Sequence, residues 1–419
     1  MPKKNSFSGE ELLVLTNYLQ SPMIDESEAI ENALEAVALL DGETRAIQRS
    51  VKEVEVFCSS ESGTRSEVPL LDTMAYVVNF ADDAGFAIIS HSTRTPTVFA
   101  MSDKGNLSPA DSVDHPGLKV FFERLPQYYR MQLAQADSLE HALLDGVLDK
   151  LVVDSGSTAK ESVGMRVLPG AGIIGGEGRQ VVYGRWYAKN KIEPKLTTHW
   201  HQYDPYNQDT PMVGTDHTLV GCIAVAIGQI MAYHQWPQYC WDEIDESSDR
   251  NLAISKLLHQ IGERVNMNYG LSSSNANSSY APSCFAHYDY EVGYLLTYSM
   301  SEIHHSLQTG MPLYARGRSS NAGHAWVIDG DISLERTVQI FEDGWEIERR
   351  TENGWLVHCN WGWRNSSKDG YYQSGIFNAN DGAGPYTNYV DFSGTRSDDL
   401  YFRTNLQVIP YIHPKQNLQ

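Results

Sequence analysis

The sequence predicts an α+β fold in two parts, and three observations lead to this prediction. Residues 54–107 alternate β-branched and aromatic runs with short turn-forming breaks, which is typical of antiparallel strands. Residues 154–184 are rich in glycine and serine and have no sustained periodicity, as expected of an exposed linker. Beyond Trp186, helical patterns come first and strand patterns second, which favours a domain with a helical lobe and an antiparallel β lobe. We therefore expect one unit in residues 1–165, ending in the linker, and a second in residues 166–419.

The first unit is expected to combine helices with a small sheet. Residues 7–49 are acidic and rich in alanine and leucine, and their interruption predicts two helices, with Ser21 or Asp25 near a cap. Residues 74–107 are strand-like, with turns at Asp-Asp-Ala-Gly and Asp-Lys-Gly. Helical character returns between Gly117 and Val152. The unit should therefore be compact and end near Val153.

The second unit should begin with helices and finish with strands. Helical runs are expected near residues 251–265 and 301–312. Four strand-like stretches follow at residues 324–330, 337–343, 345–350 and 354–363. Asp343-Gly344 and Asn353-Gly354 are dipeptides favoured in tight hairpin turns, so each is predicted to separate two of these strands.

Composition excludes several classes of protein. The chain has 419 residues, 41% of them hydrophobic, which suffices for more than one buried core. Its formal charge of −21 speaks against a nucleic-acid partner, because the field of the protein would repel phosphate. No apolar run reaches the roughly 18 residues that a membrane-spanning helix requires. The amino terminus meets glutamates before any apolar stretch, so it shows no secretory signal peptide, and we expect either a cytoplasmic chain or one that has lost its signal.

One nucleotide-binding motif occurs in the predicted linker. Gly170, Gly172 and Gly175 spell GxGxxG, but Pro169 precedes them, no amphipathic helix follows, and no βαβ unit surrounds them. Without that context, the glycines of a lone motif do not form a phosphate-binding turn. We interpret this stretch as a glycine loop and expect no cofactor.

A cysteine at the start of an uncharged segment is the first candidate for chemistry. The chain has five scattered cysteines and no CxxC pair, so at least one thiol should be free. Cys222 opens an apolar run that predicts a helix buried nearly all round. Because a helix amino terminus favours negative charge, this position should lower the pKa of the thiol and make it a nucleophile. The alternative interpretation is an inert core cysteine.

Other segments supply partners for such a thiol. His324 follows the turn-like Asn-Ala-Gly and opens a strand, so it is placed to act as a general base and acid; the alternative is a solvent-facing histidine. Asn360 ends a later strand, and its amide could hold the imidazole by a hydrogen bond. Trp361 or Trp363 could then cover that hydrogen bond and exclude water. Gln202 could donate to an oxyanion together with the backbone N–H of Cys222.

Metal and serine chemistry are less well supported. Several histidines lie in the second unit, but none forms HExxH or any carboxylate-backed spacing, and no cysteine pair flanks them, so we expect no metal site. The GxSxG motif of serine hydrolases is absent from the sequence. These histidines are His199, His201, His217, His234, His304 and His305.

Four segments in order resemble the streptopain family of bacterial papain-like cysteine peptidases. They are QYDPYN at Gln202, GCIAVAIGQIMAYHQWP at Cys222, GHAWVIDG at His324 and HCNWGW at Asn360, with a weaker match at Tyr269-Gly270. YVVNFADDAGFAIIS and PTVFAMSDKGNL resemble the propeptide of the family. The resemblance covers most of the chain from about Thr197 onward.

The resemblance implies a papain-like α+β peptidase preceded by an inhibitory α+β prodomain. Cys222 would be the nucleophile, His324 the general base and acid, and Gln202 part of the oxyanion hole. Asn360 or Trp361 would orient His324. The partners would be protein or peptide substrates, with an apolar residue two positions before the cut bond, and the chain's own prodomain as inhibitor. By this resemblance the protein is secreted or at the cell surface, and activation cuts should fall between Asp154 and Trp186, since exposed polar segments are where proteases cut.

The sequence also departs from the family. Arg364 and Asn365 stand where the family often has paired glycines, the loop between His324 and Asn360 is expanded, and residues 377–388 are poor in glycine. Two alternative functions remain open at this point. One is a binding or adhesion protein in which Cys222 is idle, and the other is a cysteine amidase or acyltransferase that uses the same pair.

Overall fold

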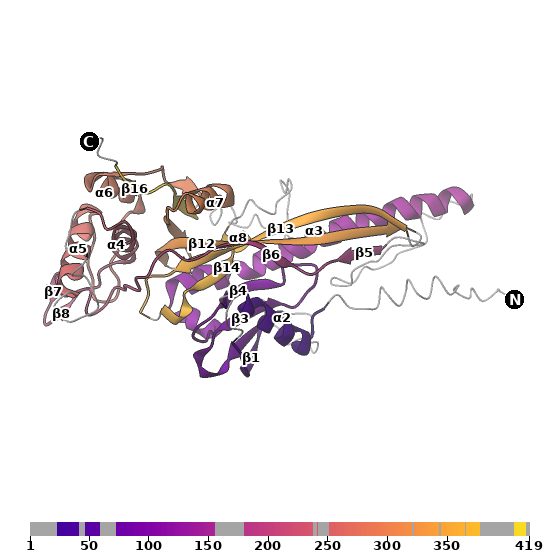
Figure 1. Ribbon diagram of the computed structural model, residues 1–419, viewed down its shortest axis with the longest axis horizontal. Coiled ribbons are helices and arrows are strands. Elements are labelled where there is room, and N and C mark those ends of the chain that lie inside the picture. Colours follow the sequence, from indigo (N-terminus) through magenta and orange to yellow (C-terminus); the bar gives the residue numbers. More distant parts are fainter. Residues whose placement is uncertain are drawn as a thin grey trace.

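The computed structural model describes residues 23–41, 47–58, 73–155, 180–237, 241, 251–320, 322–342, 345–364, 366–377 and 406–415. For residues 137–155, 180, 251–252 and 342 it describes the backbone alone. We call residues 23–155 the N-terminal unit and residues 180–415 the C-terminal unit. In Figure 1 a long helix and a long hairpin run along the molecule, and a group of helices lies at the end opposite the hairpin tip.

The N-terminal unit matches the predicted order of elements. Asp25 caps the first described helix, because its side chain accepts a hydrogen bond from the Glu28 N–H at 2.9 Å, which confirms one of the two predicted caps. The other predicted helix lies outside the described residues. The elements are α2 (Glu26–Ala38), β1 (Val51–Cys58), β2 (Thr73–Phe80), β3 (Phe86–Ser90), β4 (Val98–Ser102) and α3 (Pro116–Ser155), with 3-10 turns at Ala81–Asp83 and Pro109–Val113.

The C-terminal unit has the predicted helical and β parts. Helix α4 (Cys222–His234) is buried from Ile223 to Met231, as its apolar sequence predicted. The other helices are α5 (Asn251–Arg264), α6 (Ala281–His287), α7 (Met300–Gln308) and α8 (Ser374–Phe377), with 3-10 turns at Ser278–Tyr280 and Ser366–Lys368. The longer strands are β5 (Gln180–Tyr183), β6 (Tyr187–Ile192), β11 (Leu313–Arg318), β12 (Gly323–Glu342), β13 (Trp345–Asn360), β14 (Gly370–Gln373) and β15 (Gln407–Ile409). The two-residue strands are β7 (Met212–Val213), β8 (Asp216–His217), β9 (Tyr290–Glu291), β10 (Leu296–Thr297) and β16 (His413–Pro414).

One sheet crosses from the N-terminal to the C-terminal unit. Its order is β1-β2-β3-β4-β14-β13-β12-β11-β15-β10, and the crossing point is the antiparallel pair β4–β14. There Met101 pairs with Tyr371 and Ala100 with Tyr372. The Ser102 hydroxyl adds a bond of 2.8 Å to the Asp369 carbonyl. The two units therefore share backbone hydrogen bonds and do not merely touch.

The long hairpin corrects the sequence prediction. The four predicted strands are two, β12 and β13, and Asn353-Gly354 is not a turn, because Asn353 pairs with Glu335 and Gly354 with Leu334. A glycine suits position 354 because an added Cβ would lie 3.2 Å from the Trp186 ring. The predicted turn at Asp343-Gly344 lies outside the described residues, while Glu342 and Trp345 on either side of it pair with each other.

The hairpin is anchored to the N-terminal unit through a buried arginine. Arg336 of β12 is 3% exposed. Its guanidinium donates to the Thr93 carbonyl at 2.8 Å and the Arg94 carbonyl at 3.2 Å, and to a Glu352 carboxylate oxygen at 2.9 Å. It also lies 4.7 Å from the ring centres of Tyr183 and Trp186. Strong, multiple contacts of this kind fix the hairpin against the loop between β3 and β4.

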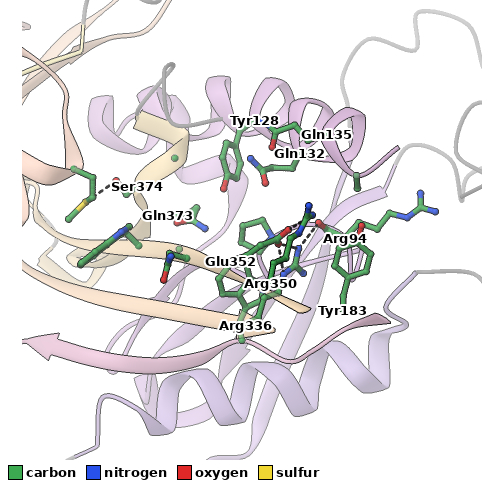
Figure 2. A pocket seen from close by; sticks show the side chains of 18 of the residues that line it. Arg94, Tyr128, Gln132, Gln135, Tyr183, Arg336, Arg350, Glu352, Gln373 and Ser374 are labelled. Atoms are coloured by element: carbon green, nitrogen blue, oxygen red, sulfur yellow. Dashed lines mark hydrogen bonds and ion pairs between the residues drawn. The ribbon is translucent and has the colours of Figure 1, made fainter. Parts of the chain in front are cut away.

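A cavity of about 800 Å³ opens beside this arginine. Figure 2 shows that its walls come from both units: Tyr128, Gln132 and Gln135 of α3 lie on one side, and Arg350 and Glu352 of the hairpin on the other. Because both units supply a wall, the cavity depends on their association.

Replacing Arg336 by methionine should destabilise the chain by about 2–4 kcal/mol, because three hydrogen bonds in a buried place are lost and Glu352 loses its closest partner. Urea unfolding in a Cys222→Ala background measures this loss. The matched control is Arg349→Met on the same hairpin, since Arg349 is exposed and pairs with Glu346 at 2.6 Å. That control should cost less than about 1 kcal/mol. Equal effects of the two changes would rule out the anchoring role of Arg336.

Candidate active site

Cys222 lies at the first position of α4, where the preceding glycine is required. Gly221 has φ of +92°, and a Cβ on it would lie 2.5 Å from the Met267 methyl carbon. Only glycine adopts this conformation without strain. The backbone N–H groups of Ala325, Ile223 and Cys222 itself face the sulfur. The thiol therefore sits among amide donors, with one of them supplied by the strand that carries His324.

The acidity of this thiol differs from the sequence prediction. We expected the helix terminus to lower its pKa, but burial raises the pKa of the Cys222 thiol, and the amide donors offset this only in part. The physical reason is that removing water from around a thiolate outweighs a few partial charges. Part of the Cys222 residue surface reaches solvent, yet the sulfur faces protein.

His324 begins β12 and is almost completely buried, at 3% exposure. Its Nε2–H donates to the Trp361 carbonyl at 2.8 Å, so Nδ1 carries no proton, and Nδ1 has no hydrogen-bond partner. Burial lowers the pKa of this imidazole to about 4. The next residue, Ala325, supplies the amide that faces the Cys222 sulfur. The fold thus brings the two residues to one place, although their side chains share no hydrogen bond in this state.

Asn360 and Trp361, the two residues predicted to orient His324, differ in their contacts. The Asn360 amide donates to the Thr198 carbonyl at 2.8 Å and accepts from Gln229 of α4 at 3.0 Å, so it links strand and helix and makes no bond to His324. Trp361 accepts from His324 through its backbone carbonyl. Its indole N–H donates to the Lys368 carbonyl at 3.1 Å, which fixes the ring under the histidine.

Gln202 lies beside the segment that leads to Cys222. Its backbone carbonyl accepts from the Val220 N–H at 3.0 Å, and the residue is 5% exposed. This pairing places the Gln202 backbone beside Val220, which lies two residues before the start of α4.

Sequence reasoning missed a residue of the N-terminal unit that reaches this site. His115 stands just before α3, is 4% exposed, and its ring centre lies 6.5 Å from His324, 5.9 Å from Trp361 and 5.7 Å from Trp363. Its Nδ1 accepts from the Leu118 N–H at 3.2 Å, and its Nε2 is buried without a partner. Burial lowers its pKa to about 3. The signal in the sequence was His-Pro-Gly at a helix start, but nothing local shows what it touches.

Gly117 of the same segment also packs on the site. A Cβ at this position would lie 2.2 Å from the Trp361 ring, so the backbone of α3 rests directly on the indole. The amino-terminal end of α3 therefore covers the residues around His324.

The remaining candidate groups do not form a second centre. The thiols of Cys58, Cys222, Cys284 and Cys359 are free, while Cys240 lies outside the described residues. Among the residues that the structure describes, no three His, Cys, Asp or Glu side chains come together as metal ligands. In the same part of the chain no helix has the length and apolar character needed to cross a bilayer.

Comparison with known proteins gives matches in both units. Residues 200–253 and 238–372 match the model of the peptidase C10 family, and residues 21–129 match the model of the Spi protease inhibitor. Streptopain of Streptococcus pyogenes is 27% identical over 252 residues, which cover 46% of this chain and 58% of streptopain. The thiol protease/hemagglutinin PrtT of Porphyromonas gingivalis is 21% identical over 397 residues, 83% of this chain and 38% of PrtT. The chain thus spans little more than half of the first relative and less of the second.

Two solved structures are also matched. A fragment of Prevotella intermedia prointerpain A has a TM-score of 0.49 at 16% identity, covering 87% of this chain and 100% of the fragment. Active interpain A from the same organism has a TM-score of 0.35 at 20% identity, covering 52% of this chain and 94% of that one. By the two family models, residues 200–372 are similar to the peptidase C10 family, and residues 21–129, which precede them, are similar to the Spi protease inhibitor.

Proposed function

We propose that this chain is the inactive precursor of a cysteine endopeptidase. The observation that carries the proposal is the position of Cys222 at the start of α4, with its sulfur facing the amide of Ala325, the residue next to His324. A thiol among amide donors, with an imidazole on the adjoining strand, supplies the two groups that acyl transfer needs.

The proposed reaction starts when the N-terminal unit leaves. The Cys222 thiolate attacks the peptide carbonyl, and its oxygen takes up negative charge near the Cys222 N–H and the Gln202 amide. His324 then gives its proton to the departing amine, so the C–N bond breaks and an acyl-enzyme thioester remains. Water attacks the thioester while His324 takes a proton from it, and the thiolate leaves. In both steps the hydrogen bond to the Trp361 carbonyl keeps the imidazole in one orientation.

The burial of Cys222 and His324 explains how the precursor is kept inactive. Burial raises the pKa of the Cys222 thiol and lowers that of His324 to about 4, so both groups are neutral and the thiolate–imidazolium pair does not form. The cover comes from His115 and Gly117, which pack on the site from the start of α3. Removing this cover restores water and favours the charged pair.

Domain limits and location belong to the same proposal. Residues 1–165 are the inhibitory unit with its linker, and residues 166–419 are the peptidase. The substrates are proteins or peptides, and the chain's own N-terminal unit is its inhibitor. The family resemblance supports action outside the cell or at its surface.

The two alternatives are distinguished by what the chain does to proteins. An idle binding protein would neither shorten itself nor cut casein, and an amidase or acyltransferase would leave casein whole. The share of the chain given to an inhibitor-like segment favours the peptidase, because an enzyme that attacks its own host's proteins needs silencing.

The first prediction concerns the nucleophile. The full chain should shorten itself and then hydrolyse casein, and Cys222→Ala should lower the casein rate by at least about 10³-fold, since no other group replaces the thiolate. A thiol alkylator should stop the reaction in the same way. The matched control is Cys58→Ser, because Cys58 is exposed on β1 and lies outside the site. Casein hydrolysis that survives Cys222→Ala would contradict the proposal.

The second prediction concerns the site of activation. The first lasting cut should fall within residues 156–179, because α3 continues to Ser155 and β5 from Gln180 is paired with β12. Mass spectrometry of the activated chain gives the new amino terminus. A new amino terminus within α3 before Ser155, or beyond Trp186, would contradict the predicted position of the activation cut.

The third prediction concerns pH. His115 and His324 have pKa values of about 3 and about 4 in the precursor, below the ordinary 6.5. Above pH 6.5 such a histidine is neutral in both the folded and the unfolded state and makes no pH-dependent contribution to stability. Below pH 6.5 the unfolded state binds a proton that the folded state does not, so the free energy of unfolding falls by about 1.4 kcal/mol per pH unit for each such histidine until the pH reaches its folded pKa. The Cys222→Ala precursor should therefore unfold at lower temperature as the pH falls from 7 to 5.

His115→Asn removes one of these histidines and should make the decline in melting temperature shallower. The control is His287→Asn at the exposed end of α6, which should leave the slope unchanged. Identical slopes for His115→Asn and the unsubstituted chain would contradict the role of His115.

A further inference from the structure

A row of side chains leads from the proposed general acid to the protein surface. The Trp363 ring centre lies 5.7 Å from His324, and the two rings meet edge to face. Tyr203 follows at 6.0 Å from Trp363, again edge to face. The Arg364 guanidinium carbon then lies 3.6 Å from the centre of the Tyr203 ring. The row therefore leads from the imidazole, over Trp363 and Tyr203, to a positive charge.

The guanidinium is stacked on a ring and has no acidic partner among the described residues. Its stacking on Tyr203 restrains the side chain and leaves the N–H groups at its edge available, since stacking uses the face of the plane. Arg364 is exposed and forms no ion pair with any acidic side chain of the described residues. Asp204 is the acidic residue nearest in sequence to Tyr203, and its carboxylate accepts from Gln208 at 3.2 Å.

The position of the row shows which part of a substrate it would meet. Under the proposed function, His324 gives its proton to the departing amine, so the residue that carries this amine lies beside the imidazole. The row continues outward from that imidazole. An extended peptide advances about 3.3 Å per residue, so the first two or three residues of the departing fragment come within reach of Arg364.

Arg364 follows the NWGW segment directly. An arginine at this position offers a planar fork of donors that matches a carboxylate.

We propose that Arg364, stacked on Tyr203, forms a subsite for a carboxylate on the departing fragment of the substrate. Two sources provide this group, the side chain of aspartate or glutamate and the carboxyl terminus of a short fragment. This inference rests on the proposed function and adds a substrate class to it: peptides that are acidic just after the cut bond.

The test uses the activated full chain and matched fluorogenic peptides. One pair differs only in glutamate or glutamine at the second position after the cut bond. A second pair has glutamine there and ends at the third position in either a free carboxylate or an amide. We expect kcat/KM to be about 10-fold higher for the glutamate peptide, mainly through KM, because the contact is made in the ground state as well as in the transition state. The preference should shrink between 50 mM and 500 mM salt.

Variants then test whether Arg364 causes the preference for glutamate. Arg364→Gln should bring the glutamate-to-glutamine ratio close to one, and Arg364→Lys should keep part of it, since lysine retains the charge but not the fork. Arg349→Gln removes one positive charge from the hairpin and serves as the matched control, so it should keep the full ratio. A larger effect in the second pair than in the first identifies the terminal carboxylate as the natural ligand.

The outcomes separate the two proposals. If the chain cuts casein and all four peptides at equal rates, or if Arg364→Gln keeps the ratio, the subsite is ruled out while the peptidase stands. If the unsubstituted chain cuts neither casein nor any peptide, the proposed function fails and the subsite with it.

Discussion

The removal of water from around Cys222 and His324 is the constraint on which the rest of the structure depends. A thiol and an imidazole exchange a proton readily where water and amide donors stabilise both charges, and they stay neutral where burial penalises each charge. The start of α3 contributes to the burial around His324, because His115 and Gly117 pack on Trp361 and its neighbours. Under the proposed function, these residues therefore oppose the chemistry of the site.

The start of α3 is held over the site by contacts between the N-terminal and C-terminal units. The pairing of β4 with β14 makes one sheet of two units, and Arg336 fixes the hairpin to the loop after β3. The apolar core is also shared, since Ile332, Leu334 and Leu356 of the hairpin pack with α2 and its strands. Separation of the units would therefore break backbone hydrogen bonds and expose apolar surface. Under the proposed function, release of the site requires dissociation of the units as well as a cut in the chain.

The aromatic residues around His324 form one cluster. Under our proposals, this cluster takes part in inhibition, in catalysis and in substrate binding. The Trp361 carbonyl accepts a hydrogen bond from the imidazole of His324, and Trp363 touches both His115 and Tyr203 of the row that ends at Arg364. A cover that rests on Trp363 also occupies the side on which we place the departing fragment. Inhibition and substrate binding would then compete for the same rings.

The sequence by itself determined several of the elements and the candidates for the reactive groups. Asp25 as a cap, the buried α4 and the position of Cys222 at its start followed from local rules, because caps and periodicity involve neighbours a few residues apart. The tertiary structure alone decided the rest. It merged four predicted strands into one hairpin, reversed the expected direction of the Cys222 pKa, and brought His115 to His324 across more than two hundred residues. These outcomes depend on burial and on contacts between distant segments, and neither is encoded in any short stretch of the chain.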